Sequence, residues 1–486
     1  MHRPFDYDAE GSGSLNAVLA RSYLRFDWSQ TRGMPILSLD RDRAPAIVFY
    51  PDHPPLVPLV IVPFYKAFGI GAWQTRLPIA LFTLAAILLL HRVLAQFATA
   101  RVGLIAAAVF AATPMTLYFG GFADVVGLPL IFFVLLALDR YLHFERSPGY
   151  RTFAPCAIAF AAAGFCDWPA YVLAPVVVGH FFVEKPRDEW RWAIGLCVAT
   201  CLIFIAVYAY ITLATHSPWT WMADLFTRRS GLTGRAAYSW PQWITSGTRI
   251  NAAYHTWPLI ALTVGWIVMF ALRRRAPQGT VIARLLLVWA LAVAVIGSKA
   301  FFDHEWAWSV FTPGLAVAAA FVLQRLPTRA IAGILVAFAI WTTHGAWTRL
   351  YPPHRDRPFS PRQTARAVQL AAPALRDVAL LVGNEDEAQL WLYGDRSLRS
   401  GIWSIEDFQR RVDDDTVDLM FNFDVQPWGA RATGLVFPKI WSKRFTTLYT
   451  YLHERYREVP LGSPLADLFT VFDLRGPAGS RSTVAP

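Results

Sequence analysis

Residues 75–97, TRLPIALFTLAAILLLHRVLAQF, are the first long apolar block of this chain, and blocks of this kind decide its fold class. A helix needs about 20 apolar residues to cross a bilayer, and this block is long enough. Further blocks follow as far as residue 347, so the length criterion predicts about ten membrane helices. Their approximate ranges are 75–97, 101–119, 126–143, 152–168, 169–184, 191–214, 256–272, 282–299, 306–324 and 329–347.

The composition agrees with a membrane protein. Of the 486 residues, 55% are hydrophobic and 16% are charged, whereas a soluble globular protein has about 25% charged residues. The formal charge of +11 would suggest a nucleic-acid partner in a soluble protein. Here the basic residues lie in short gaps between the apolar blocks, where they indicate topology instead. We therefore predict an α-helical polytopic membrane protein that has membrane lipid, and no nucleic acid, as a partner. We assign no disulfide and no metal site to its four cysteines.

Charge divides the gaps between the blocks into two alternating sets. The basic gaps hold Arg92 and Arg101, then Arg140, Arg146 and Arg151, then Lys185, Arg187 and Arg191, then Arg273, Arg274, Arg275 and Arg284, and finally Arg325 and Arg329. The other short gaps hold Asp124, Asp167 and Asp303-His304-Glu305, with Lys299 as their one base. The positive-inside rule places the basic gaps in the cytoplasm and the acidic gaps outside. The same parity puts residues 1–73, the loop 215–255 and the tail outside.

Residue 1 thus falls on the outer side, although no apolar helix or signal peptide precedes it. Either the following helix translocates this short segment, or a further N-terminal membrane helix is missing from the start. We favour the missing helix.

Three regions follow from this pattern. Residues 1–74 form an outer loop with a juxtamembrane helix, because residues 15–24 have helical periodicity with a polar face. The prolines between residues 51 and 63 are expected to break the next stretch into bends. Residues 75–347 form the transmembrane bundle, and residues 348–486 form a small extracytoplasmic α/β domain with a disordered end.

The elements expected in this last domain come from short apolar runs and one helical pattern. They are strands at 378–383, 417–423 and 468–474, a helix over 446–457 and a disordered segment from Gly476.

Three polar clusters fall on the outer side: the carboxylates Asp6, Asp8 and Glu10, the loop around Asp124, and the turn Asp303-His304-Glu305. Loops on one side of a bundle can form a single site, where carboxylates act as bases and cations hold an anionic leaving group. The alternative for each cluster alone is a solvated surface loop.

Two further residues have structural interpretations. Asp167 precedes Trp168 and Pro169, so we interpret it as the start of an interfacial helix. His304 suits a pH switch or a metal ligand, but a histidine beside aromatic residues is more often an interface residue.

A series of short motifs lies in the first 150 or so residues. They are Asp6, Asp8 and Glu10, His53-Pro54-Pro55-Leu56, Phe68-Gly69, Arg76-Leu77-Pro78, Thr113-Pro114, Tyr118 and Asp124. This series resembles the GT-C fold, and more narrowly the family 39-like branch of lipid-dependent glycosyltransferases. That branch includes protein O-mannosyltransferases and the aminoarabinose transferases of lipid A. Each motif is short, but their order and spacing together are fairly specific.

The resemblance implies an inverting glycosyltransferase in a bacterial inner membrane, with its active site facing the periplasm. Such enzymes take a sugar from a polyprenyl-phosphate carrier and pass it to a hydroxyl group of a glycan, lipid or protein. A carboxylate acts as general base, and cations stabilise the leaving phosphate. Relatives that mannosylate proteins need no metal, while more distant ones use a divalent metal, so no cofactor is assigned with certainty.

Individual residues acquire roles from the same resemblance. Asp6 and Asp8 are the candidates for the catalytic base, and the motif does not distinguish between them. The candidate substrate-binding residues are Glu10, His53, Arg76, Asp124, His304 and Glu305. His53 stands where aminoarabinose transferases commonly have lysine, so to bind phosphate it must be protonated or donate a hydrogen bond.

Two other functions fit a polytopic membrane protein. One is a transporter or flippase of a lipid-linked or anionic solute, which would be expected to carry ionisable residues at mid-helix and broken helices in paired halves. The other is a non-catalytic subunit of an envelope-glycan assembly complex, which would lack the carboxylates. The acidic residues in the outer loops favour the enzyme.

Overall fold

The computed structural model describes residues 11–36, 49–124, 127–230, 238–271 and 279–346, and in the tail residues 378–382, 397–402, 409, 432–439, 446–461 and 465–477. The chain divides into two compact units. The described parts of residues 51–64 and 74–352 form the helical unit. Those of residues 2–50, 65–73 and 353–486 form the second unit.

All the regular secondary structure in the described part of the helical unit is helical. The long ones are α4 (Ala72–Phe97), α5 (Ala100–Ala112), α7 (Leu128–Arg146), α8 (Tyr150–Cys166), α9 (Leu173–Glu184), α10 (Trp190–Thr215), α12 (Trp240–Tyr254), α13 (Trp257–Trp266), α14 (Thr280–Ile296), α16 (Thr312–Leu323) and α17 (Thr328–Gly345). Shorter ones are α6 (Pro114–Phe119), η2 (Trp168–Val172), η3 (Arg187–Glu189), α11 (Trp221–Ser230), η4 (Ile267–Ala271), α15 (Ser298–Asp303) and η5 (Glu305–Phe311). Helix α3 (Leu56–Phe68) precedes α4.

Each predicted membrane segment contains a helix, which confirms the polytopic helical fold. One predicted segment, 101–119, is interrupted, because α5 ends at Ala112 and Thr113 is extended (φ −66°, ψ 141°) before Pro114 begins α6. A residue before proline is pushed out of the helical region, and proline is favoured at the first helical position.

Length and apolar composition allow three of the described helical stretches to cross a membrane: Ala72–Phe97, Arg187–Thr215 and Glu305–Leu323. The pair Trp240–Tyr254 and Trp257–Met269, bent by 106°, adds a fourth if it counts as one span. Leu56–Phe68, Ala100–Ala112, Trp168–Glu184 and Thr280–Ile296 are shorter apolar helices. The count of about ten crossings therefore stays a prediction.

Apolar side chains also cover the outside of the bundle. Leu202, Ile205 and Leu213 on α10 are 61%, 57% and 65% exposed, and Ile340 on α17 is 67% exposed. Large apolar side chains so exposed in a water-soluble monomer would form an unusual patch, whereas lipid tails cover them without cost.

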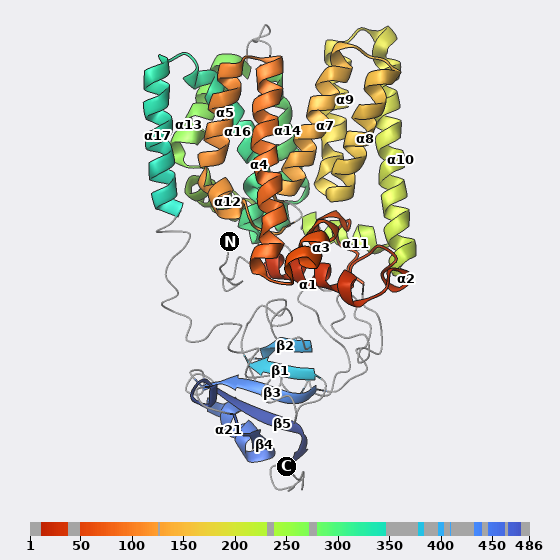
Figure 1. Cartoon of the computed structure of the whole chain (residues 1–486), viewed down its shortest axis with the longest axis vertical. Coiled ribbons are helices and arrows are strands. Elements are labelled where there is room, and N and C mark those ends of the chain that lie inside the picture. Colours follow the sequence, from red (N-terminus) through yellow and green to blue (C-terminus); the bar gives the residue numbers. More distant parts are fainter. Residues whose placement is uncertain are drawn as a thin grey trace. The chain divides into compact units, whose positions relative to one another are not determined.

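Apart from α12, which lies at one end, the long helices run side by side and alternate in direction, so their connections collect at two ends of the bundle (Figure 1). One end carries residues 98–99, 147–149, 185–189 and 324–327. The opposite end, which we call the site end, carries residues 51–55, 120–124, 167–172 and 297–311, with α11 and α12. The described basic gaps and the acidic gaps thus lie at opposite ends, as their charge pattern predicts. Which side of the membrane each end faces stays a prediction.

Helix α3 corrects the expectation that prolines divide residues 51–63 into bends. The helix runs through Pro58 and Pro63 without interruption. Pro58 lies in the first turn, where its missing N–H group is not needed for a helical hydrogen bond, and Pro63 costs one such bond inside the helix.

In the second unit, the predicted helix over residues 15–24 is confirmed as part of α1 (Gly11–Arg25), which is followed by the short α2 (Trp28–Thr31). Its predicted polar face is not exposed, because Asn16 and Arg21 are 5% and 4% exposed. Both side chains have polar or electrostatic partners, which burial of such groups requires.

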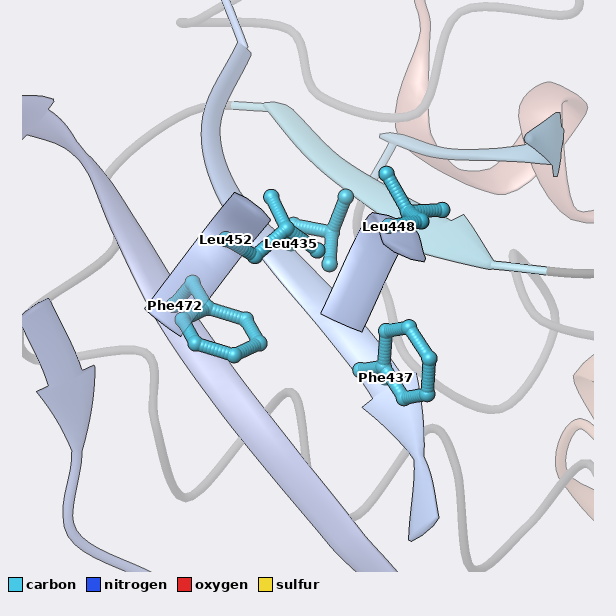
Figure 2. Packing of buried hydrophobic residues seen from close by; sticks show 5 residues of the cluster. All are labelled: Leu435, Phe437, Leu448, Leu452 and Phe472. Atoms are coloured by element: carbon cyan, nitrogen blue, oxygen red, sulfur yellow. The ribbon is translucent and has the colours of Figure 1, made fainter. Parts of the chain in front are cut away.

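The tail contains a five-stranded sheet of order β2-β1-β3-β5-β4. Its strands are β1 (Val378–Val382), β2 (Ser397–Ile402), β3 (Ala432–Pro438), β4 (Tyr456–Val459) and β5 (Phe469–Pro477). Strand β1 pairs in parallel with β2 and β3, whereas β5 is antiparallel to β3 and β4. Helix α21 (Thr446–Arg455) packs Leu448 and Leu452 against Leu435, Phe437 and Phe472 (Figure 2), and a one-turn helix α22 (Leu465–Leu468) precedes β5.

This sheet confirms the predicted strands at 378–383 and 468–474 and the predicted helix, although Tyr456 and Arg457 belong to β4. The predicted strand 417–423 lies outside the described residues. Gly476 and Pro477, expected to be disordered, end strand β5. The α/β class of the tail is therefore as predicted.

Close packing between α12 and η5 generates a stability prediction. A Cβ atom on Gly247 would lie 2.5 Å from Cη2 of the Trp308 ring, much closer than van der Waals contact. We expect Gly247→Ala to lower the free energy of unfolding by about 1–3 kcal/mol, the usual cost of overpacking. The measurement is the apparent Tm in detergent. As a matched control, Gly333→Ala on α17 meets no atom within 4 Å and should leave the Tm unchanged or slightly raised. Equal Tm values for the two variants would contradict the packing argument.

Candidate functional site

The polar knot at residues 51–55 is held by the chain segment after α8. His53 Nδ1 lies 2.7 Å from Oδ1 of Asp167, a carboxylate that is fully buried. The next residue, Trp168, donates a hydrogen bond from Nε1 to the carbonyl oxygen of Asp52, at 2.8 Å. Consecutive residues of one segment therefore contact consecutive residues of the other.

The local sequence explains why Asp167 reaches this position. Helix α8 ends at Cys166, and Asp167 is extended (φ −166°, ψ 158°) before the short helix η2 begins at Trp168, with Pro169 in its first turn. The break turns the chain at the site end, where a polar side chain can leave the apolar bundle. Asp167 is thus a buried hydrogen-bond partner of His53, which our interpretation of it as an interfacial helix start did not include.

Helix α11 brings a cation to the same knot. Arg229 Nη2 lies 3.7 Å from Oδ2 of Asp52, whose side chain is 2% exposed. The position of α11 is set by Trp221, whose ring lies 6.0 Å from that of Trp168 and whose Nε1 donates to Thr212 at 2.9 Å. The loop between α10 and α12 therefore contributes positive charge to the site end.

His304 lies among these charges. Burial, which is the largest cause, and the nearby Arg229 guanidinium together lower the pKa of His304 from 6.5 to about 4, with Asp303 acting in the opposite direction. Lys299 and His53 also lie close enough to act on it electrostatically. Its ring stacks on Trp306 with 4.5 Å between centroids. The imidazole is therefore neutral at pH 7.

An aromatic cluster joins this turn to the second outer loop. Phe122 lies 5.2 Å from Trp306 and 5.4 Å from Phe119, whose ring is 5.4 Å from that of Tyr254. The hydroxyl group of Tyr254 donates a hydrogen bond to Glu305, which keeps an exposed side chain. Aromatic faces beside a carboxylate and a hydroxyl group suit the mixed apolar and polar surface of a sugar ring.

The bend between α12 and α13 places Tyr254. His255 is fully buried, with Nδ1 2.8 Å from Asn251 Oδ1 and Nε2 2.9 Å from Thr312 Oγ1. Thr256 follows with φ +71°, a region that β-branched residues rarely adopt. Such strain persists only where its surroundings hold it, and here the buried histidine does so.

Asp124 and Arg76 complete the set of predicted residues in the helical unit. Asp124 is 5% exposed, and it acts electrostatically on the Cys166 thiol together with Asp167. A Cβ atom on Gly121 would lie 3.7 Å from Cβ of Arg76, so the start of α4 lies against the second outer loop. Both side chains already have partners within the protein.

The structure therefore brings five of the predicted residues to the site end, namely His53, Arg76, Asp124, His304 and Glu305. Asp6, Asp8 and Glu10 lie outside the described residues. Sequence reasoning missed Asp52, Asp167, Arg229 and Tyr254 as members of this site. The signal for Asp167 was its place in an acidic gap on the same predicted side as His53.

Metal binding was also left open by the sequence. Within the described ranges, no three His, Cys, Asp or Glu residues gather in a group that could hold a metal ion. Since the N-terminal carboxylates lie outside those ranges, a divalent metal stays a prediction.

Comparison with known proteins adds three findings. Residues 52–219 match the family described as dolichyl-phosphate-mannose-protein mannosyltransferase. No curated protein matches the chain. Among solved structures, ArnT from Cupriavidus metallidurans bound to undecaprenyl phosphate is similar, with a TM-score of 0.62 and 16% identity over 97% of this chain and 94% of that one.

Two further structures show the same likeness. The apo state of ArnT has a TM-score of 0.54 at 15% identity, over 97% of this chain and 94% of that one. The archaeal oligosaccharyltransferase AglB from Archaeoglobus fulgidus, in complex with an inhibitory peptide and a dolichol-phosphate, has a TM-score of 0.54 at 10% identity, over 96% and 71% of the two chains. At identities this low, the structural likeness shows a shared fold and nothing more specific.

The lowered pKa of His304 predicts a pH dependence of stability. Between pH 6.5 and about 4 the unfolded chain binds a proton at His304 that the folded chain does not, so stability falls as pH falls through this window. His304→Gln should reduce the fall in apparent Tm, by an amount equivalent to at most about 1.4 kcal/mol per pH unit. Arg229→Gln should narrow the pH range over which stability falls, because it removes one cause of the lowered pKa of His304. Identical pH profiles for His304→Gln and wild type would contradict this assignment.

Proposed function

We propose that this chain, an integral membrane protein with the GT-C fold, is an inverting glycosyltransferase that uses a polyprenyl-phosphate sugar as its donor. The acceptor would be a hydroxyl group of a glycan, lipid or protein. The reaction would take place at the site end, facing the periplasm of a bacterial inner membrane.

The observation that carries this proposal is the convergence of charged loops at one end of an apolar bundle. His53, Asp124 and Asp167 come from separate connections, and all three fall within the residues that match the mannosyltransferase family. Arg229 and His304 join them from later connections. A lipid-linked donor needs this arrangement, because its tail stays in the bilayer while its phosphate must meet polar groups.

The donor phosphate becomes more negative as the glycosidic bond breaks, so cations placed near it lower the barrier. The site end offers Arg76, Arg229 and Lys299 as permanent cations, and His53 when it is protonated. Their charge is partly offset by Asp52 and Asp303, which pair with Arg229 and Lys299 respectively. The net charge around residues 51–55 therefore depends on whether His53 carries one proton or two.

The acceptor half of the reaction needs a base. In our proposal the acceptor hydroxyl oxygen attacks the anomeric carbon, its proton passes to the carboxylate of Asp6 or Asp8, and the carbon–oxygen bond to phosphate breaks with its electron pair on the phosphate. The products are an inverted glycoside and polyprenyl phosphate. Asp124 and Glu10 would orient the substrates for this in-line displacement.

The aromatic cluster gives the proposal a second half-site. Trp306, Phe122 and Tyr254 would pack against a sugar ring, while Glu305 would accept hydrogen bonds from its hydroxyl groups. Neutral His304 would add a hydrogen-bonding edge without adding charge. Pentose and hexose rings both suit this chemistry.

The test follows release of polyprenyl phosphate by the purified protein, supplied with a panel of polyprenyl-phosphate sugars and total envelope acceptor. We expect release from one donor, and a loss of about 10²-fold or more in kcat for whichever of Asp6→Asn and Asp8→Asn removes the base. Asp124→Asn should lower activity less. Asp188→Asn, an exposed carboxylate at the opposite end of the bundle, is the matched control and should retain full activity.

Other outcomes discriminate between functions. If neither Asp6→Asn nor Asp8→Asn changes the release of polyprenyl phosphate, the protein is still a glycosyltransferase and Asp124 becomes the candidate base. If no donor releases polyprenyl phosphate but labelled lipid crosses a reconstituted bilayer, the protein is a transporter and the glycosyltransferase proposal is wrong. Neither release nor transport would favour a non-catalytic subunit.

A further inference from the structure

The contact between His53 and Asp167 differs from the other fully buried carboxylate pair of the bundle. At the opposite end, Asp139 is also 0% exposed, and it is paired with two permanent cations, Arg92 at 3.3 Å and Arg140 at 3.1 Å. Asp167 has no arginine or lysine within ion-pair distance in the described part of the chain, and its partner there is an imidazole. A carboxylate that served stability alone would gain more from a permanent cation.

We propose that Asp167 is a positioning residue, which holds His53 in one orientation and one protonation pattern for contact with the phosphate of the donor. This role rests on the proposed glycosyltransferase function. Asp167 does not contact the substrate in this proposal, and it acts only through the imidazole of His53.

The hydrogen bond determines which nitrogen of His53 carries a proton. An ionised carboxylate only accepts hydrogen bonds, so Nδ1 must be the donor in the 2.7 Å contact. The second nitrogen, Nε2, lies on the far side of the ring from Asp167, and it becomes the atom through which His53 acts. A carboxylate or carbonyl group orients a functional imidazole in the same manner at metal sites and in catalytic triads.

The backbone around His53 is restrained as well. Trp168, next to Asp167, holds the Asp52 carbonyl at 2.8 Å, so the ring and the preceding peptide are fixed by one segment. Pro51, Pro54 and Pro55 limit the backbone conformations on both sides. The imidazole therefore cannot rotate without breaking the contact to Asp167.

Burial makes the carboxylate effective. Asp167 is 0% exposed, and its second oxygen, Oδ2, has no hydrogen-bond partner among the described residues. Its negative charge is thus poorly screened and is directed at the imidazole ring. When His53 is protonated and donates a hydrogen bond from Nε2 to a phosphate oxygen, Asp167 stabilises the imidazolium. The phosphate leaves as an anion, and no proton needs to be transferred through the pair.

The test is a double-mutant cycle that compares Asp167→Asn in the wild-type protein and in a His53→Lys background. Asparagine keeps the size and one acceptor oxygen but removes the charge. In the wild-type background we expect kcat for polyprenyl phosphate release to fall about 10–100-fold, the usual effect of losing such a supporting group. A lysine ammonium has no tautomers and keeps its charge without a supporting carboxylate. In the His53→Lys background, Asp167→Asn should therefore lower kcat by about threefold or less.

Controls separate positioning from stability. Asp139→Asn removes the other fully buried carboxylate, and it should lower the apparent Tm while kcat per folded molecule stays unchanged. If His53→Lys is inactive, the His53→Ala background replaces it, and there Asp167→Asn should cause no further loss of kcat. A purely structural Asp167 would lower kcat by the same factor in every background.

The outcomes keep the two proposals apart. The positioning role would be overturned if Asp167→Asn kept the wild-type kcat, or if it lowered kcat by the same factor in all backgrounds. Neither result would contradict the glycosyltransferase function. A wild-type protein that releases no polyprenyl phosphate from any donor would overturn the function and this role with it.

Discussion

The whole structure depends on one constraint, that a chain inside a bilayer must satisfy its backbone hydrogen bonds within each segment. Helices are the solution available to this composition, and they leave polar side chains few places except the helix ends. The alternating helices therefore collect the polar residues of distant segments into two layers. One layer holds the described basic gaps together with their carboxylate partners Asp139 and Glu145. The other holds the acidic gaps of the site end together with Arg229 and Lys299.

The two layers treat charge differently. At the basic end, Asp139 lies between Arg92 and Arg140, and Lys185 pairs with Glu145 at 2.9 Å, so charges are matched by permanent partners. At the site end, carboxylates contact a histidine and a tyrosine as well as cations, and the His304 ring stacks on Trp306. Groups that can gain or lose protons and hydrogen bonds are concentrated where a reaction would need them, which is typical of functional sites.

The sequence predicted the helical fold and the separation of charge because both follow from local patterns of apolar and basic residues. It predicted His53, Arg76 and Asp124 through short motifs. It could not predict the partnership of His53 with Asp167, since the two residues are 114 positions apart and only the packed bundle brings them together. Strand β3 was missed for a local reason, because Gly434 and Pro438 obscure the strand pattern. The prolines of α3 likewise concealed its uninterrupted course through Pro63.

The clamp between residues 52–53 and 167–168 has a consequence for biosynthesis. Asp52 and Trp168 are separated by 116 positions, so the N-terminal knot cannot reach its final conformation until the segment after α8 has left the ribosome and entered the membrane. Arg229 arrives later still, after α10 is inserted. The nascent chain thus carries an incomplete site through most of its synthesis, and assembly of that site reports that the first half of the bundle has been inserted in the correct order.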